Sequence, residues 1–298
     1  MRKLTGPGRP HPALYLFPLP AVVLYVVFFV IPTVQAVQYA ATDWDGFSPD
    51  YENVGADNIV KLVTGGDSLF TNALVNNVQF LLVVVVVQTL LSLGLALMLL
   101  RTTTVSVFVR SVYFLPAILS SVSVAFIWRF VYDPNVGPIN QGLAAIGLEN
   151  LQSGFLGDPD QAIYWVAMTQ VWAHAGQLMV IFIAGLQQIP EDLYEAARLD
   201  GAGRWQQFRH VTWPLVAPTT AIVVAYTTIQ SFKAFDLILG LGGNPPRGSL
   251  DILSTRIYTT FTNSEFGYAA AQSLIFMAVI LAVTVLQRRA LKLTQRGV

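Results

Sequence analysis

The chain has 298 residues, of which 54% are hydrophobic and only 11% are charged, and its mean hydropathy is +0.56. This composition leaves too little polar material to coat a soluble globule of that length. The formal net charge of zero, without a basic stripe, argues against a nucleic-acid partner. The absence of Cys excludes disulfides and thiolate metal sites. The sequence therefore predicts an all-α integral membrane protein in a lipid bilayer.

Six apolar segments follow one another, and each is long enough to cross a hydrocarbon layer of ~30 Å as a helix. They cover residues 13–41, 73–100, 109–132, 161–188, 213–241 and 268–287. A secretory signal is the alternative interpretation of the first segment, but its apolar run is about twofold longer than a usual signal core. We therefore expect one six-helix membrane domain over residues 13–287, after a disordered cytoplasmic lead of residues 1–12 and before a cytoplasmic tail of residues 288–298.

The basic residues are distributed unequally between the two sides of this arrangement. One side carries twelve Lys and Arg residues, and the other carries three: Lys61, Arg247 and Arg256. Because basic loops are retained in the cytoplasm, both termini and the loop at residues 189–212 are expected there.

Two clusters of uncharged polar residues lie near the middle of the fourth and fifth segments. In each cluster the spacing places the side chains on one side of a helix. The residues are Gln170, His174 and Gln177 in the fourth segment, and Thr227, Gln230 and Ser231 in the fifth.

Two interpretations of these clusters stay open. Polar groups in lipid need partners, so the clusters either line a polar path or join helices through hydrogen bonds. Amide and hydroxyl groups suit a substrate rich in hydroxyls, and Trp172 or Phe232 would stack on a sugar face. We therefore treat the six residues as candidates for a substrate path.

Charged residues within the predicted spans are few. Lys233 and Asp236 are three residues apart, near the outer end of an unbroken fifth helix. They are interpreted as a structural ion pair, a proton relay, or a contact of Lys233 with an acidic substrate. Arg129, close to the end of the third segment, fits a snorkelling anchor or a functional cation.

Motifs for catalysis and cofactor binding are missing from the sequence. It has no GxxxxGK[ST] phosphate loop, and Gly242-Gly243-Asn244-Pro245 lacks the Lys and Ser or Thr that such a loop needs. The three histidines have no metal-binding spacing. The chain is therefore expected to have no ATPase site, catalytic residue, metal site or cofactor of its own.

A polar island separates the fourth and fifth segments. Pro190 suits the start of a helix, with Glu191 and Asp192 in its first turn, and residues 200–203 (DGAG) suit its end. A second helical turn from Arg204 leads to Pro214. The island is thus predicted to be a helix-turn-helix between two spans.

This island carries a resemblance to a known family. Glu195-Ala196-Ala197, then Gly201 and Val211-Thr212-Trp213-Pro214, resembles the cytoplasmic EAA loop of permease subunits in binding-protein-dependent ABC importers. Val211 and Trp213 stand where the family usually has Ile and Leu. The longer string EAARLDGA, with Phe208 and Pro218, resembles the carbohydrate-uptake branch, in its first-permease type.

The resemblance implies a type I importer permease fold in the bacterial cytoplasmic membrane. It implies a second homologous permease, two ATPase subunits or domains that bind ATP and Mg, an extracytoplasmic solute-binding protein and a carbohydrate substrate. In the family the EAA loop is a coupling helix that docks in a groove of the ATPase, and the fourth and fifth helices hold the sugar. Carried over to this sequence, the coupling residues are Glu195, Ala196, Ala197, Asp200, Gly201 and Ala202.

Two other classes of protein were weighed against this one. A proton-coupled secondary sugar carrier would need no ATPase and would respond to a pH gradient. A membrane-embedded sugar-transferring enzyme would need a catalytic loop of acidic residues, and the outer Asp residues have no acid/base spacing. The sequence does not name the sugar.

Overall fold

A computed structural model describes residues 16–296 of the chain, so the predicted lead at residues 1–12 lies outside the described residues. The described part is helical, apart from turns, loops and one isolated bridge between Thr42 and Asn53. It divides into two compact units, which are described separately. The first comprises residues up to Thr64 and Thr260–Ile275, and the second comprises Gly65–Thr259 and the residues from Phe276 onward.

The first unit begins with one continuous apolar helix. Its residues, Leu19–Tyr39, form α1, a π-helical turn η2, and α2, and none of its most apolar window is buried inside the chain. A polar loop and α3 follow, and the unit ends with parts of α14 and α15. The bounds are α1 (Leu19–Tyr25), η2 (Val26–Val30), α2 (Ile31–Tyr39), α3 (Asp57–Val63), α14 (Leu253–Thr262) and α15 (Phe266–Arg296).

Side-chain hydrogen bonds fix the loop after α2 within this unit. Asn58 Nδ2 donates to the carbonyls of Ala40 (3.0 Å) and Thr42 (2.9 Å). The Trp44 carbonyl accepts the N–H of Gly267 at 2.9 Å, and the Trp44 ring lies 5.7 Å from that of Phe266. The loop is therefore tied to the beginning of α15.

The second unit contains the central helices and the polar island. Three of its helices begin at a residue whose side chain caps them: Asp67 caps α4, Thr103 caps α6 and Ser120 caps α7. The bounds are α4 (Ser68–Val83), η3 (Val84–Gln88), α5 (Thr89–Met98), α6 (Thr104–Phe114), η4 (Leu115–Ile118), α7 (Ser121–Val131), α8 (Pro138–Ala145), η5 (Glu149–Leu151), η6 (Phe155–Gly157), α9 (Ala162–Leu186), α10 (Glu191–Leu199), α11 (Arg204–Gln207), η7 (Phe208–Thr212), α12 (Trp213–Phe232) and α13 (Asp236–Gly242).

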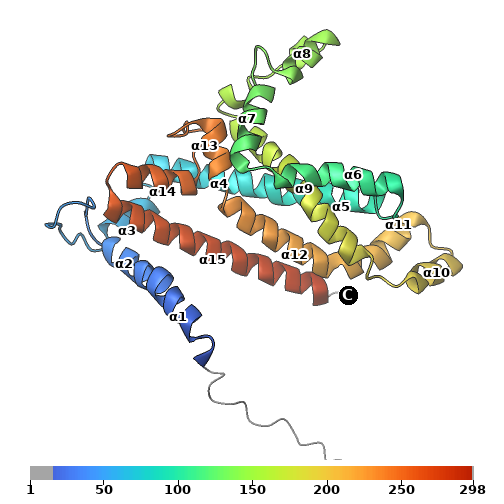
Figure 1. Ribbon diagram of the computed structural model, residues 1–298, viewed down its shortest axis with the longest axis horizontal. Helices are drawn as coiled ribbons and strands as arrows, with labels where there is room; N and C mark the ends of the chain where they lie inside the picture. The colour runs from blue at the N-terminus through green and yellow to red at the C-terminus, as the bar shows by residue number, and fades with distance from the viewer. Residues whose placement is uncertain (1–15, 297–298) are drawn as a thin grey trace, which may run out of the picture. The chain divides into compact units, whose positions relative to one another are not determined.

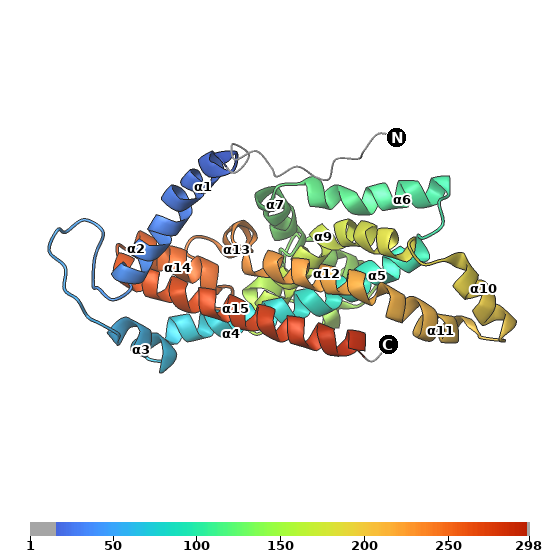
Figure 2. The ribbon, with the colours of Figure 1, turned by 90° about the horizontal axis from the view of Figure 1, so that it is seen from below.

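Helix α9 is the centre of the second unit, where α4, α5, α6 and α12 pack against it (Figures 1 and 2). Ser92 of α5 donates to the Ala175 carbonyl of α9 at 2.9 Å. At Gly176 the helices approach so closely that a Cβ atom would lie 1.9 Å from the Tyr113 carbonyl oxygen of α6. Only glycine permits that contact, so the sequence fixes the packing of α6 on α9 there.

The structure has the predicted number of spans, but the third and the fifth differ in shape from the prediction. Five helices are long and apolar enough to cross a membrane, and the pair α6–η4 and α7 makes a sixth if it is counted as one span. This pair, predicted as one segment at residues 109–132, starts at Thr104 and bends by 102° between Ile118 and Ser121. Pro116 lies in the 3₁₀ turn before the bend, and extended Ser120 starts the next helix, so the chain turns there.

Candidate functional site

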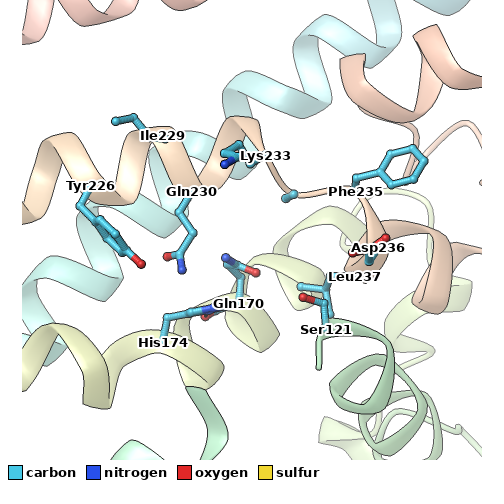
Figure 3. Close-up of a pocket in the computed structure, with 11 residues that line it drawn as sticks. Ser121, Gln170, His174, Tyr226, Ile229, Gln230, Lys233, Phe235, Asp236 and Leu237 are labelled. Carbon is cyan, nitrogen blue, oxygen red and sulfur yellow. Dashed lines mark hydrogen bonds between the residues drawn. The ribbon is translucent and has the colours of Figure 1, made fainter. Parts of the chain in front are cut away.

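A cavity of about 300 Å³ lies within the second unit, where α12 ends, α13 begins and α9 faces both (Figure 3). Figure 3 shows side chains from α9 and α12 pointing into the same space. The polar residues lining the cavity are Gln170 and His174 from α9, Tyr226 and Gln230 from α12, and Lys233 and Asp236 from the junction. Ser121, at the start of α7, adds a hydroxyl group.

The junction exists because the fifth span is broken. The sequence predicted one helix over residues 213–241, but α12 ends at Phe232 and α13 starts at Asp236. Ala234 and Phe235 join the two helices without helical structure, with Phe235 at φ −133°. The break opens the cavity and brings a Lys and an Asp to it.

Lys233 and Asp236 therefore do not form the predicted pair on one helix. Lys233 is the C-cap of α12, and Asp236 is in the first turn of α13, where the helix dipole favours a carboxylate. Both side chains are exposed, and no ion pair joins them within the described residues. The expectation of a structural ion pair is wrong because it depended on an unbroken helix.

Three of the six predicted path residues line the cavity: Gln170, His174 and Gln230. His174 Nδ1 lies 3.1 Å from the Gln170 carbonyl, which orients the imidazole. A fourth, Gln177, lies beyond the lining and donates from Nε2 to the Tyr226 hydroxyl at 3.1 Å. The structure thus brings four of the six residues to the cavity or to its edge.

The other two predicted path residues, Thr227 and Ser231, are fully buried and do not line this cavity. The Ser231 hydroxyl donates to the Thr227 carbonyl at 2.9 Å. They lie about 100° around α12 from Tyr226 and Gln230, because each residue turns an α-helix by that angle. Their positions match the hydrogen-bonding interpretation, whereas Gln230 matches the path interpretation.

The aromatic residues at the cavity are not the ones proposed from the sequence. Phe232 packs against Phe276 with ring centroids 5.8 Å apart, and Trp172 packs edge-on against Trp128 at 5.3 Å. Tyr226 and Phe235 line the cavity instead. Tyr226 precedes Gln230 by one turn, so the helical period could have identified it.

Gln88 is a further residue that the sequence did not assign to the path. It is fully buried at the end of the π-helical turn η3, and its Nε2 donates to Gln230 Oε1 at 3.4 Å. Its Oε1 has no hydrogen-bond partner in the described part of the chain. Gln88 thus supports a lining residue from behind, and π-helical turns often occur at functional positions.

The polar island folds as predicted, with a short helix followed by a second one. Helix α10 has Pro190 as its N-cap and Glu191 and Asp192 in its first turn. It ends at Asp200, where Gly201 adopts φ +80° and the Ala202 N–H donates to the Ala197 carbonyl at 2.9 Å. This is the terminating geometry that a glycine after a helix permits.

Most of the α10 surface is exposed. Glu195 pairs with Arg198 at 3.9 Å, but both side chains are more than half exposed, so the pair contributes little to stability. Leu193 is 42% exposed and Leu199 is 89% exposed. Trp205, which follows the turn, is 68% exposed. Apolar side chains that are left uncovered in this way indicate a surface for a partner.

Helix α10 is attached to the base of the fifth span. The hydroxyls of Tyr194, in α10, and Thr212 lie 3.0 Å apart, and Gln207 Nε2 donates to the carbonyl of Ala202, in the turn after α10, at 2.8 Å. Helix α11, the π-helical turn η7 and α12 form one continuous helix from Arg204 to Phe232. The exposed helix and the cavity are therefore connected to the two ends of the same helix.

Comparison with known proteins identifies the family. Residues 70–293 match the family described as "Binding-protein-dependent transport system inner membrane component". The chain belongs to this family. It is 36% identical over 281 residues to the probable ABC transporter permease protein YurN of Bacillus subtilis, covering 93% of this chain and 95% of that protein. It is 32% identical to the diacetylchitobiose uptake system permease protein NgcF of Streptomyces coelicolor, covering 92% and 80%.

A solved structure has the same fold as this chain. A chain of a bacterial ABC transporter that imports the acidic polysaccharide alginate superimposes with a TM-score of 0.80 at 24% identity, covering 94% of this chain and 95% of that chain. The resemblance inferred from the island and the predicted type I importer permease fold are therefore confirmed. The roles assigned to individual residues stay predictions.

Proposed function

We propose that this inner membrane component is a permease subunit of an ATP-driven sugar importer and forms half of the translocation path. The observation that carries the proposal is the cavity at the break between α12 and α13. Its amide, imidazole, phenol and hydroxyl groups donate and accept hydrogen bonds, as a ligand rich in hydroxyls requires. Tyr226 and Phe235 supply aromatic faces for a sugar ring. The cavity volume, about 300 Å³, fits one or two sugar rings.

The names of several relatives support a carbohydrate substrate. They include a starch degradation products transport permease, a multiple sugar-binding transport permease and a trehalose/maltose transport permease, at 29%, 30% and 27% identity. The glycerol-phosphate permease of Agrobacterium fabrum is 30% identical. We therefore assign the substrate to sugars and their derivatives, without naming one.

We further propose that α10 couples this subunit to a separate ATPase. Its Ala196 and Ala197 side and the exposed Leu199 would pack in a groove of the ATPase, while Glu195 would form a charge-assisted contact with an Arg of that partner. Gly201 permits the turn that presents the helix. ATP and Mg would be bound by the partner, and this chain would have no enzymatic activity alone.

The complete importer would contain a second homologous permease, two ATPase subunits or domains and an extracytoplasmic solute-binding protein. Twelve basic residues on the α10 side against three on the other support a cytoplasmic position for α10 and both termini. The bacterial cytoplasmic membrane is the location that fits this arrangement.

The proposal is tested by reconstituting the complete complex in vesicles with the binding protein, using a panel of radiolabelled sugars. We expect accumulation of at least one sugar only when ATP is supplied on the α10 side. Uptake by this chain alone, driven by an imposed pH gradient without nucleotide, would contradict the proposal and support a secondary carrier.

A further inference from the structure

A second cavity of about 280 Å³ lies in the same unit, at the ends of α7 and α13. It shares no lining residue with the cavity of Figure 3. Arg129 from α7 and Arg247 from the loop after α13 both line it. Neither arginine forms an ion pair in the described part of the chain. Two guanidinium groups therefore lie at one cavity, and neither is in direct contact with a carboxylate of the described residues.

The first wall of this cavity, residues 133–157, is held in place by side-chain hydrogen bonds. Asp133 Oδ1 accepts the N–H groups of Asn135 (2.9 Å) and Val136 (3.0 Å). Buried Asn140 donates from Nδ2 to the carbonyls of Pro134 and Ser153, each at 3.0 Å. This wall is organised before any ligand arrives, which reduces the entropy cost of binding.

The second wall, the loop that carries Arg247, is fixed to α4. Asn72 and Asn76 both donate to the Gly248 carbonyl, at 2.6 and 2.8 Å, and Asn76 also donates to the Asp251 carbonyl at 2.9 Å. The buried carboxylate of Asp251 lies 3.6 Å from Arg256 Nη1. The residue next to Arg247 is therefore fixed, so the arginine is presented from a rigid base.

The charges around the cavity favour an anion. Its one acidic residue, Asp133, uses Oδ1 in the turn, and the backbone N–H donors of Val136 and Asn135 lower the pKa of that carboxyl group. Asp133 is therefore ionised at neutral pH, and the lining retains one net positive charge. The planar guanidinium group binds carboxylates through two parallel hydrogen bonds, which a partly enclosed site strengthens.

We propose that this cavity, named here the arginine pocket, receives an acidic side chain of the solute-binding protein when that protein docks on the permease. The inference rests on the proposed function, including the predicted outer position of residues 133–160 and 242–267. Three features favour this occupant. The family depends on a binding protein, the pocket lies at the ends of α7 and α13 and is lined in large part by the loops that follow them, and it is separate from the candidate sugar cavity.

The test measures ATPase stimulation of the complete complex in nanodiscs as the binding protein is titrated. Arg247→Glu should raise the concentration for half-maximal stimulation about tenfold or more, because a like charge replaces the attraction. Saturating binding protein should restore the maximal rate, which a misfolded variant would not allow. Arg247→Lys should give a smaller rise, since Lys keeps the charge but loses the two-bond geometry.

The matched control is Lys61→Glu, which makes the same charge change at an exposed residue that is on the predicted outer side and does not line the arginine pocket. Its titration curve should match that of the unsubstituted complex. Acidic residues on the docking face of the binding protein are then replaced by Lys, one at a time. One of these binding-protein variants should restore the half-maximal concentration of the Arg247→Glu complex to that of the unsubstituted pair.

Two outcomes would overturn the inference. One is a titration curve for Arg247→Glu that equals that of Lys61→Glu. The other is an effect that disappears in nanodiscs made only of zwitterionic lipid, which would assign the arginine pocket to anionic lipid headgroups. A failure of the proposed function looks different, because the unsubstituted complex would then show no stimulation by any binding protein.

Discussion

The polar island around α10 and the cavity beside α12 are both polar regions of an apolar chain, but they are built in opposite ways. The island is one contiguous stretch that folds through local contacts and leaves its side chains exposed. The cavity is assembled from α7, α9, α12 and α13, and it depends on a helix break. A site made of one contiguous stretch can thus be predicted from its local sequence, whereas a site assembled from several helices also depends on how those helices pack.

The largest expected effect comes from breaking the assembled region at its tightest contact. Gly176→Val would place side-chain atoms against the Tyr113 carbonyl, which lies 1.9 Å from the position of a Cβ atom. We expect the loss of about 3 kcal/mol or more of folding free energy. Thermal unfolding in detergent measures it.

The control for Gly176→Val is Gly94→Val, at a helical glycine with no neighbouring atom within 4 Å of the added Cβ. Val has a slightly higher intrinsic helix propensity than Gly, so this substitution should change the folding free energy by less than about 1 kcal/mol and should not destabilise the helix. Equal losses at both positions would contradict the importance of the close approach between α6 and α9.

The next largest effect should come from the island. Glu195→Lys reverses the charge proposed to contact the ATPase, and we expect ATP-driven uptake to fall at least about tenfold, equivalent to ~1.4 kcal/mol. Glu195 is exposed and its ion pair with Arg198 is weak, so folding should not change. Uptake by reconstituted complexes and thermal unfolding of the same samples measure the two quantities.

Asp192→Lys is the control for Glu195→Lys, because it makes the same charge change on the same exposed helix outside the proposed contact. It should leave uptake within about twofold of the unsubstituted complex. If both variants lose uptake equally, the general charge of α10 matters rather than the contact of Glu195.

A smaller effect is expected behind the cavity. Gln88→Leu keeps the side-chain volume but removes the donor to Gln230. Because Gln230 would then be free to turn away, we expect the KM for uptake to rise about three- to tenfold, with the maximal rate nearly unchanged. A fall in the maximal rate with constant KM would contradict a positioning role.

Two polar residues near α12 separate the path interpretation from the hydrogen-bonding one. Gln177→Ala removes the donor to Tyr226, and we expect KM to change about two- to fivefold across a sugar series. Ser231→Ala removes a buried hydroxyl that donates only within its own helix, so transport kinetics should not change. A KM change in Ser231→Ala alone would reverse the two assignments.

The smallest effect concerns pH. Burial raises the pKa of Asp251 above its usual value, while Thr255 and Arg256 oppose this shift. Because its pKa is raised in the folded state, the Asp251 carboxyl group makes its full contribution to stability at pH values below its unfolded pKa of about 3.9. This contribution is lost as the pH rises through the folded pKa. Asp251→Asn should therefore gain thermal stability relative to the unsubstituted chain between pH 4 and pH 7. A difference that is constant with pH would contradict this.

The sequence predicted the local features and missed those that distant packing decides. The limits of α10 followed from Pro190, the acidic first turn and Gly201, all within a few residues. The number of apolar segments followed from hydropathy. The bend after Ile118 and the end of α12 at Phe232 were not predicted, although Pro116 and Lys233 lie beside them, because a single proline or charged residue in an apolar segment does not decide whether the helix continues.

Burial explains why only some of the predicted path residues line the cavity. Helical spacing placed Gln230, Thr227 and Ser231 on one side of α12, and that side is divided between the cavity and the interior of the bundle. The boundary is set by α9 and by Gln88, which is 142 residues from Gln230 in sequence. No local pattern contains that information.

The continuous helix from Arg204 to Phe232 has 29 residues and is roughly 43 Å long at 1.5 Å per residue. Near its beginning, Thr212 is bonded to Tyr194 of α10 and Gln207 to the turn after α10, and its last turns carry Tyr226 and Gln230. In the proposed importer it would transmit motion from α10 to the cavity, and it can bend at η7 and at Pro218, which lies inside the helix. Movement of α10 during the nucleotide cycle would then tilt Tyr226 and Gln230 together, and the helix between α10 and the cavity would stay wound.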